Sequence, residues 1–164
     1  MNLSDFLTLN EYARLSFLNQ GITYAVYTEK DGGTEKIFPF DLFPRIIEQQ
    51  EWAQLENGLQ QRNTALNLFI ADIYNSQKIL KDKVVPAELI LSSKHYCKLM
   101  EDIQPIGNIY THIAGTDLIR HTDGQFYVLE DNLRSPSGVS YVLSNRKALQ
   151  RTLLDLFHSL TVNP

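Results

Sequence analysis

The chain has little cysteine, no long apolar run and no excess of basic residues. Cys97 is the one cysteine among 164 residues, and because a single thiol cannot form an internal disulfide, we expect a reducing, cytoplasmic compartment. No apolar stretch reaches the ~18–20 residues that cross a bilayer, and the first residues lack the basic start of a signal peptide. The formal net charge of −4 argues against nucleic acids and anionic membranes as partners, because both favour basic patches.

Length and apolar content are those of one globular domain. A chain of 164 residues matches the usual range of ~100–200 residues for a domain, and 43% of its residues are hydrophobic. We therefore predict a single domain over residues 1–164. Helical periodicity alternates with short strand-like segments, which predicts an α/β (α+β) fold with a mainly antiparallel sheet and flanking helices.

The hydrophobic pattern gives approximate bounds for the elements. Ser4 is the expected cap of a first helix and Gly21 its end. Further helices are predicted over residues 51–74, 92–102 and 139–159, and strands over residues 22–28, 35–40 and 109–113, with a turn at Asp31-Gly32-Gly33. The period of residues 87–91 is too short to distinguish a helix from a strand.

A β-hairpin is predicted where two alternating runs, residues 116–120 and 125–130, flank Asp123-Gly124. Alternation places Phe126, Val128, Glu130 and Asn132 on one side of the second strand.

The length of the hairpin loop decides the position of Asp117. A two-residue loop puts Asp117 opposite Glu130, and a four-residue loop puts it opposite Val128. Both keep Asp117 on the face of Glu130 and Asn132, whereas a three-residue loop would move it to the other face.

Asp117, Glu130 and Asn132 would together bring two carboxylates and an amide oxygen to one end of the hairpin. Like charges on a sheet repel, so such a cluster favours a bound cation, a proton or open water. Hard oxygen donors are the ligands that Mg²⁺ or Mn²⁺ prefers. The alternative is that these are polar residues at a fraying hairpin end, with Asn132 closing a turn.

The turn that follows has the composition of an anion site. A helix that begins near Ser137 or Gly138 would direct free backbone N–H groups toward the carboxylates. Arg134 can grip an anion through two parallel hydrogen bonds. The alternative is a serine N-cap beside an exposed arginine, but the succession of metal ligands, arginine and helix start favours a phosphate site.

Four other polar residues are predicted to have ordinary structural roles. Asp41 is expected in a turn or an N-cap, and Arg62 on a solvated helix face. His95 and Cys97 lack the partners that would complete a zinc spacing or a nucleophile, so packing or exposure is expected for both.

The hairpin region also resembles a known family. The segments that carry the resemblance are TDLIR, GQFYVLEDNLRSPSGVSYVLSNR, GITYAVYTE, FPFDLFPRII and VVPAELILSS. Together they resemble the circularly permuted type 2 ATP-grasp proteins, which are similar to glutathionylspermidine synthetase-like ligases. The resemblance extends from about Gly21 to Arg146.

The resemblance implies an ATP-dependent ligase that joins a carboxylate to an amine, each a small molecule or a peptide, through an acyl phosphate. ATP and Mg²⁺ (or Mn²⁺) are the implied cofactors. By resemblance, Asp117, Glu130 and Asn132 are the metal ligands and Arg134 is catalytic. The residues implied near the transferred phosphate are Ser135, Ser137 and Gly138.

The sequence departs from this family in two respects. Glutathionylspermidine synthetase-like relatives carry an arginine where this chain has Gly115, and that role would then fall to Arg134. A lysine-bearing nucleotide lobe follows the metal motif in the family, so we expect the chain to be the Mg²⁺ and phosphate half of a longer protein. Without that lobe, exposure of Leu153, Leu154 and Phe157 would favour a homodimer.

Two other function classes remain open at this point. One is a non-catalytic fragment or subunit that docks with a partner carrying the rest of the site. The other is a metal-dependent phosphoesterase, which fits the oxygen cluster but not the resemblance.

Overall fold

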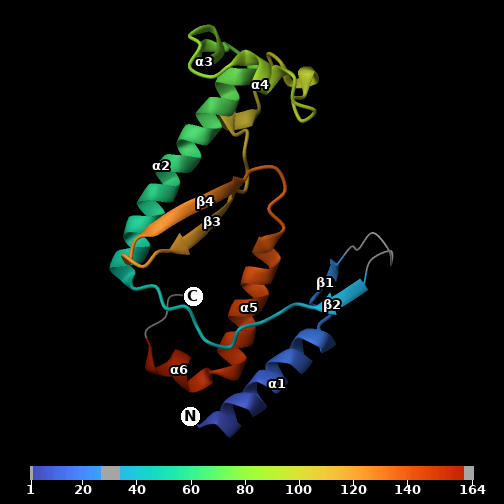
Figure 1. Ribbon diagram of the computed structural model, residues 1–164, viewed down its shortest axis with the longest axis vertical. Helices are drawn as coiled ribbons and strands as arrows, with labels where there is room; N and C mark the ends of the chain where they lie inside the picture. Colours follow the sequence, from blue (N-terminus) through green and yellow to red (C-terminus); the bar gives the residue numbers. More distant parts are fainter. Residues whose placement is uncertain (1, 27–33, 161–164) are drawn as a thin grey trace. The chain divides into compact units, whose positions relative to one another are not determined.

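A computed structural model describes residues 2–26 and 34–160, and its elements are labelled in Figure 1. The chain divides into two compact units. The terminal unit comprises Met1–Ile46 with Ser137–Pro164, and the central unit is Ile47–Pro136. The single domain over residues 1–164 expected from chain length stays a prediction.

The terminal unit contains α1 (Leu3–Asn19), β1 (Thr23–Val26), β2 (Thr34–Ile37), α5 (Gly138–Thr152) and α6 (Leu154–Ser159). Asn2, not Ser4, caps α1, because the Asn2 side chain accepts a hydrogen bond from the Asp5 backbone at 2.9 Å. Gly21 follows the helix at φ +65°, as predicted from the permissive backbone of glycine. The turn predicted at residues 31–33 lies outside the described residues.

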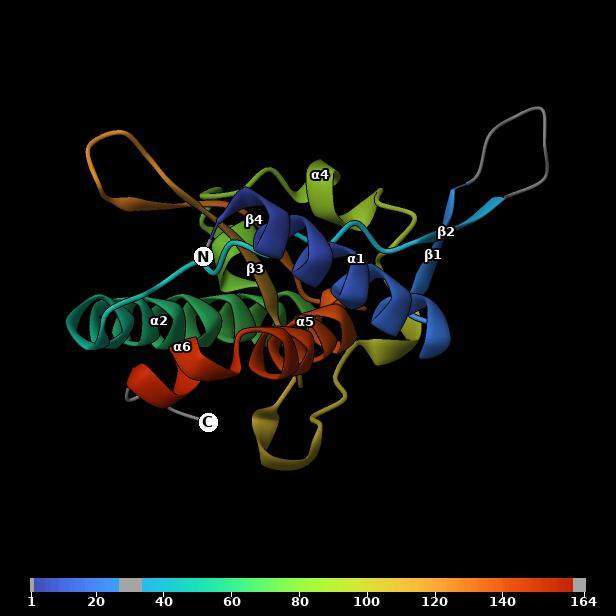
Figure 2. The ribbon, with the colours of Figure 1, turned by 90° about the horizontal axis from the view of Figure 1, so that it is seen from below.

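Aromatic rings pack together in the core of the terminal unit, and one hydrogen bond there joins residues that are far apart in the sequence. Phe17 is fully buried, and its ring centroid lies 5.0 Å from that of Phe40. Phe38 stacks on Tyr141 of α5 at 4.3 Å, and the Tyr141 hydroxyl donates to the Thr23 carbonyl at 2.7 Å. These contacts join α5 to the N-terminal elements, and α1 and α5 lie side by side in both views (Figures 1 and 2).

The last predicted helix is divided in the structure. Leu153 has φ −117° and ψ 49°, so α5 ends at Thr152 and α6 begins at Leu154. The sequence here has neither proline nor glycine, and no local breaker signalled the division. The prediction of one helix over residues 139–159 was therefore wrong.

The central unit contains α2 (Gln49–Tyr74), α3 (Lys78–Lys81), α4 (Ala87–Leu91), the 3₁₀ turns Lys98–Met100 and Ile106–Asn108, β3 (Gly115–Arg120) and β4 (Phe126–Asn132). Gly58 does not divide α2, which runs on without interruption. Asp72, in the last turn of α2, stabilises the start of α3, because its carboxylate accepts hydrogen bonds from the backbone of Lys78 and Ile79. A hydrogen bond from the Ser76 hydroxyl is the main reason that the pKa of Asp72 is lowered, and the two backbone bonds add to the effect.

Two predicted elements of the central unit are irregular in the structure. Residues 109–113 form no strand, because the Asn67 carboxamide accepts from the backbone of Tyr110 at 2.8 Å and of Thr111 at 3.3 Å. Its nitrogen donates to the Asn108 carbonyl at 2.9 Å, so a side chain on α2 replaces a partner strand. The helix predicted over residues 92–102 is reduced to the turn Lys98–Met100.

Each unit holds one small antiparallel sheet in the described part of the chain. The pairs are β1–β2 and β3–β4, with helices beside each of them (Figure 1). This confirms the predicted α/β (α+β) class with antiparallel pairing and flanking helices. No helix within residues 2–26 and 34–160 is long and apolar enough to cross a membrane.

Candidate metal and phosphate site

The β3–β4 hairpin has a three-residue loop. The His121 backbone donates to the Gln125 carbonyl and the Gly124 backbone to the His121 carbonyl, each at 2.9 Å. Gly124 lies at φ +80°, and the Asp123 carboxylate accepts from the Gln125 backbone at 2.8 Å, which explains the turn signal of this pair. In a regular hairpin, a loop of this length would place Asp117 and Glu130 on different faces of the sheet.

A β-bulge at Leu129 reverses that displacement. Leu118 pairs with Val128, but the neighbouring Asp117 pairs with Glu130, so Leu129 is an extra residue in β4. The loop and the bulge each shift the register by one residue in opposite senses. Asp117 therefore lies directly opposite Glu130, the pairing that a simple two-residue loop would have produced.

The bulge also divides β4 between two faces. The helix face, directed toward α2, carries Thr116, Leu118, Arg120, Phe126, Val128 and Asp131. The outer face carries Asp117, Ile119, Tyr127, Glu130 and Asn132. The prediction that Phe126 and Val128 share a face with Glu130 was wrong, because strict alternation ends at the bulge.

Asp131 on the helix face is held by an arginine. Its side chain is 9% exposed and lies 2.6 Å from Nη2 of Arg62, while Arg62 Nε also donates at 2.7 Å and the Thr116 hydroxyl at 2.9 Å. The hydrogen bond from Arg62 is the main reason that the pKa of Asp131 is lowered. Arg62 is exposed on its helix, as predicted, but the prediction missed this ion pair, which joins α2 to β4.

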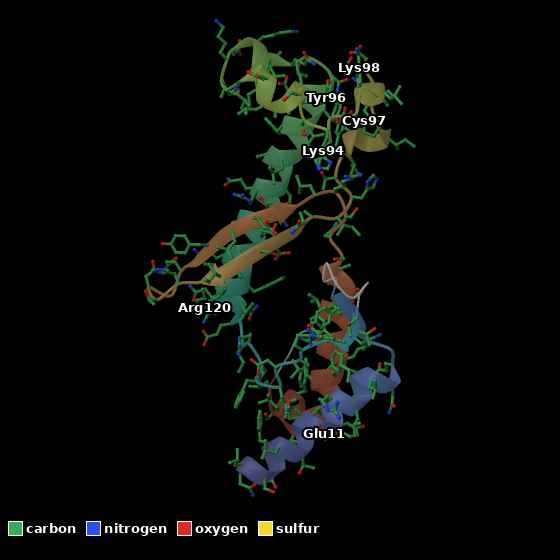
Figure 3. The ribbon with its side chains drawn as sticks, turned by 45° about the vertical axis from the view of Figure 1, so that its right-hand side comes forward. Glu11, Lys94, Tyr96, Cys97, Lys98 and Arg120 are labelled. Carbon is green, nitrogen blue, oxygen red and sulfur yellow. The ribbon has the colours of Figure 1, made fainter. Side chains whose placement is uncertain are left out.

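A second ion pair joins α2 to the hairpin near its loop. Nη2 of Arg120, labelled in Figure 3, donates to both carboxylate oxygens of Glu51 at 2.8 Å. The guanidinium lies 4.7 Å from the centre of the Phe126 ring. A cavity of about 980 Å³ lies between α2 and this face, with Leu55, Leu59, Leu118, Phe126 and Val128 among its lining residues.

The outer face carries acidic residues without such partners. Asp117 and Glu130 are exposed, and within residues 2–26 and 34–160 neither forms an ion pair. Directly paired residues on neighbouring strands have Cβ atoms about 4.5–5.5 Å apart. The Asn132 amide nitrogen donates to Glu130 at 3.1 Å, which brings the third predicted ligand beside the second.

The donor chemistry of this trio fits a hard divalent cation. Two carboxylates and one amide supply oxygen ligands only, as Mg²⁺ and Mn²⁺ prefer. The described residues contain no cluster of three or more His, Cys, Asp or Glu side chains of the metal-binding kind. The trio has two such residues, so a cation here would complete its coordination with the amide, water or a ligand.

The turn after β4 folds over the start of β3. A Cβ atom added to Gly115 would lie 2.8 Å from Cβ of Pro136 and 3.7 Å from Cβ of Asn132. The proline ring cannot swing aside as a flexible side chain would, so this position has no room for the arginine expected from the resemblance.

Arg134 and Ser135 lie in that turn, and Arg134 has a partner that the sequence did not indicate. Nη1 of Arg134 lies 3.2 Å from Nδ1 of His95. No periodicity or motif connects residues 39 positions apart, so sequence patterns could not reveal this contact. The role predicted for Ser135 beside a phosphate stays a prediction.

Ser137 and Gly138 belong to the terminal unit. The helix start predicted there is confirmed, because α5 begins at Gly138. Ser137 is the N-cap residue of α5, as in the alternative, but its side chain forms no capping hydrogen bond. Their roles toward a phosphate stay predictions.

Residues 44–164 match the family described as circularly permuted ATP-grasp type 2. The chain belongs to this family. That confirms the resemblance drawn from the hairpin and turn segments. A relative from Synechocystis, an uncharacterized protein, is 46% identical over 155 residues, which are 94% of this chain and 32% of that protein.

Other relatives of this ATP-grasp chain are also much longer. An uncharacterized protein of Mycobacterium leprae is 47% identical over 87% of the chain and 24% of its own length. A putative glutamate–cysteine ligase of Frankia casuarinae is 37% identical over 80% of the chain and 15% of its own length. The chain thus spans about a third or less of these relatives.

Proposed function

We propose that the chain supplies the divalent-metal ligands of an ATP-dependent carboxylate–amine ligase. The observation that carries the proposal is the pairing of Asp117 with Glu130, beside Asn132, on the outer face of the hairpin of an ATP-grasp protein. The relative named as a putative glutamate–cysteine ligase supports the reaction class.

In this proposal the outer face holds Mg²⁺ or Mn²⁺ through Asp117, Glu130 and Asn132. When bound, the cation offsets negative charge on the phosphates of ATP. Arg134 holds an oxygen of the transferring phosphoryl group, because its guanidinium keeps its charge at any physiological pH. Ser135, in the same turn as Arg134, supplies a further hydrogen-bond donor to that phosphate. The roles predicted for Ser137 and Gly138, which belong to the terminal unit, stay predictions.

The proposed reaction has two steps. A carboxylate oxygen takes the γ-phosphoryl group, which releases ADP and leaves an acyl phosphate. The amine nitrogen then attacks the acyl carbon, the C–O bond to phosphate breaks, and the amine loses a proton. The proposed substrates are small molecules or peptides in the cytoplasm.

Dimerisation of the chain through the region around Leu154, whose side chain is exposed, stays a prediction.

Binding of Mn²⁺ to the 164-residue chain, followed by electron paramagnetic resonance, tests the ligands directly. Asp117→Asn and Glu130→Gln should each weaken binding by at least about tenfold, because each removes one anionic oxygen donor. Glu51→Gln is the matched control, since it removes one negative charge from the other side of the hairpin. Equal affinity in all four proteins would reject the metal assignment.

Turnover of the complete protein tests the reaction. Glu130→Gln should lower Mg²⁺·ATP-dependent ADP release on the order of 100-fold, because a metal that stabilises phosphoryl transfer contributes several kcal/mol. Its melting temperature should remain close to that of the unmodified protein, since the side chain is exposed. Unchanged ADP release would contradict the proposed ligase site.

A further inference from the structure

The arginines of the central unit differ in the charge of their partners. Arg62 and Arg120 are each paired with a carboxylate, Asp131 and Glu51. Arg134 is instead 3.2 Å from the imidazole Nδ1 of His95, and within the described ranges it has no carboxylate in salt-bridge contact. A partner without negative charge leaves the positive charge of Arg134 uncompensated.

The chemistry of the two groups decides the direction of this hydrogen bond. A guanidinium has five N–H donors and no acceptor, so Nδ1 must accept the hydrogen bond from Arg134. This contact uses one donor of Arg134 and leaves four others for an anion.

The segment that carries His95 is fixed to the end of α2. The Tyr96 ring stacks on Tyr74 with centroids 5.1 Å apart and an angle of 7°, and the Cys97 backbone donates to the Tyr74 hydroxyl at 3.1 Å. Figure 3 labels Tyr96 and Cys97 in this segment. The Tyr96 hydroxyl also donates to Glu101 at 2.8 Å, so His95 belongs to a well-connected segment.

We propose that His95 is a positioning residue that holds the Arg134 guanidinium while leaving its full charge for a phosphate oxyanion of the nucleotide. This inference rests on the proposed function of the outer face and turn. A carboxylate in place of His95 would hold Arg134 at least as firmly, but it would neutralise the charge that an anion requires. An imidazole acceptor, which carries no negative charge, provides orientation without that loss.

Two isosteric variants separate these effects in the complete protein. His95→Asn keeps a neutral oxygen acceptor near the position of Nδ1, and His95→Asp places a carboxylate oxygen at the same position. We expect kcat/KM for Mg²⁺·ATP within about threefold of the unmodified protein for His95→Asn, and a loss of about 30-fold for His95→Asp. His95→Ala, which removes the acceptor, should lose about tenfold.

The order of these variants distinguishes positioning from structural support. A merely structural contact would tolerate His95→Asp best, because an ion pair with Arg134 would be the stronger contact. Melting temperatures should therefore rank His95→Asp at or above His95→Ala while activity ranks it below. Equal activity of His95→Asp and His95→Asn would overturn the inference.

Arg134→Ala gives the reference that connects the inference to the proposed function. It should lower kcat/KM on the order of 100-fold, and adding His95→Ala to it should cause no further loss. Normal activity of Arg134→Ala would overturn both the inference and the proposed role of Arg134. The Glu130→Gln variant tests the metal ligands independently of Arg134. Loss in Arg134→Ala with normal His95→Asp would reject the inference alone.

Discussion

Glu130 and Asp131 are neighbours in β4, yet they lie on opposite faces of the hairpin in different surroundings. Asp131 is 9% exposed and bound by Arg62, with a further hydrogen bond from Thr116. Glu130 is exposed and opposite another carboxylate, Asp117. Asp131 stabilises the fold through its ion pair with Arg62. Glu130 instead lies beside a like charge, where a bound cation would relieve the repulsion.

The contrast shows what separates a structural acid from a candidate ligand. Both residues carry the same charge, so the charge itself is uninformative. The difference is whether the fold supplies the compensating charge, as Arg62 does for Asp131, or leaves the carboxylate available to an ion, as we propose for Glu130. Substitutions on the two faces should therefore affect different properties of the protein.

Gly115→Ala should have the largest effect on stability, because it fills the outer face where the turn packs. The new Cβ would lie 2.8 Å from the Pro136 ring, and relieving such overpacking costs about 1–3 kcal/mol. Urea denaturation measures this loss. Gly58→Ala is the control, since nothing lies within 4 Å of its added Cβ, and it should stabilise α2 by about 0.5–1 kcal/mol.

Asp131→Asn should lower the free energy of unfolding by about 1–2 kcal/mol, because it weakens charge-assisted hydrogen bonds from Arg62. The value is at the lower end for such bonds because the Arg62 side chain is 44% exposed. Asp117→Asn, on the outer face, is the matched control and should change stability much less. Equal losses in the two variants would remove the distinction between the faces.

The effect of Asp131→Asn should depend on pH. The hydrogen bond from Arg62 lowers the folded-state pKa of Asp131, so the carboxylate contributes its stability fully above the ordinary aspartate pKa of about 3.9. That contribution is lost as the pH falls through the lower, folded-state pKa. Urea denaturation of the unmodified protein and of Asp131→Asn from pH 7 downward should show the difference in their free energies of unfolding shrinking below about pH 4. A difference that does not change with pH would contradict the stabilising role of the Asp131 carboxylate.

Glu130→Gln should have the smallest effect on stability. It relieves repulsion with Asp117 on an exposed surface, so without divalent cations the change should be within about 0.5 kcal/mol and favourable. Added NaCl should reduce the gain, because salt screens exposed charges. A clear loss of stability would show that Glu130, like Asp131, has a structural partner.

Much of the local structure was predictable from local chemistry. Gly21 ends α1 and Asp123-Gly124 forms the hairpin turn, because glycine adopts positive φ and the aspartate side chain bonds the backbone two residues on. The stretch from residue 51 to Tyr74 was predicted as helix from its apolar period, and α2 covers it. Such signals act within a few residues and need no distant partner.

The irregular segments were beyond this reasoning because distant side chains determine them. Residues 109–113 read as a strand, but Asn67 takes their backbone hydrogen bonds. The sequence predicted a solvated Arg62, but this side chain binds Asp131, which lies 69 residues away. In each case the deciding partner lies far along the chain.

The sequence by itself determined the oxygen-rich residues and the hairpin that carries them, because alternation and turn chemistry are local. Only the tertiary structure decided that Asp117 meets Glu130, since a three-residue loop and the bulge at Leu129 shift the register in opposite senses. It also decided that Arg134 meets His95 and not a carboxylate. Register and long-range pairing depend on how the whole unit packs, which no short window of sequence contains.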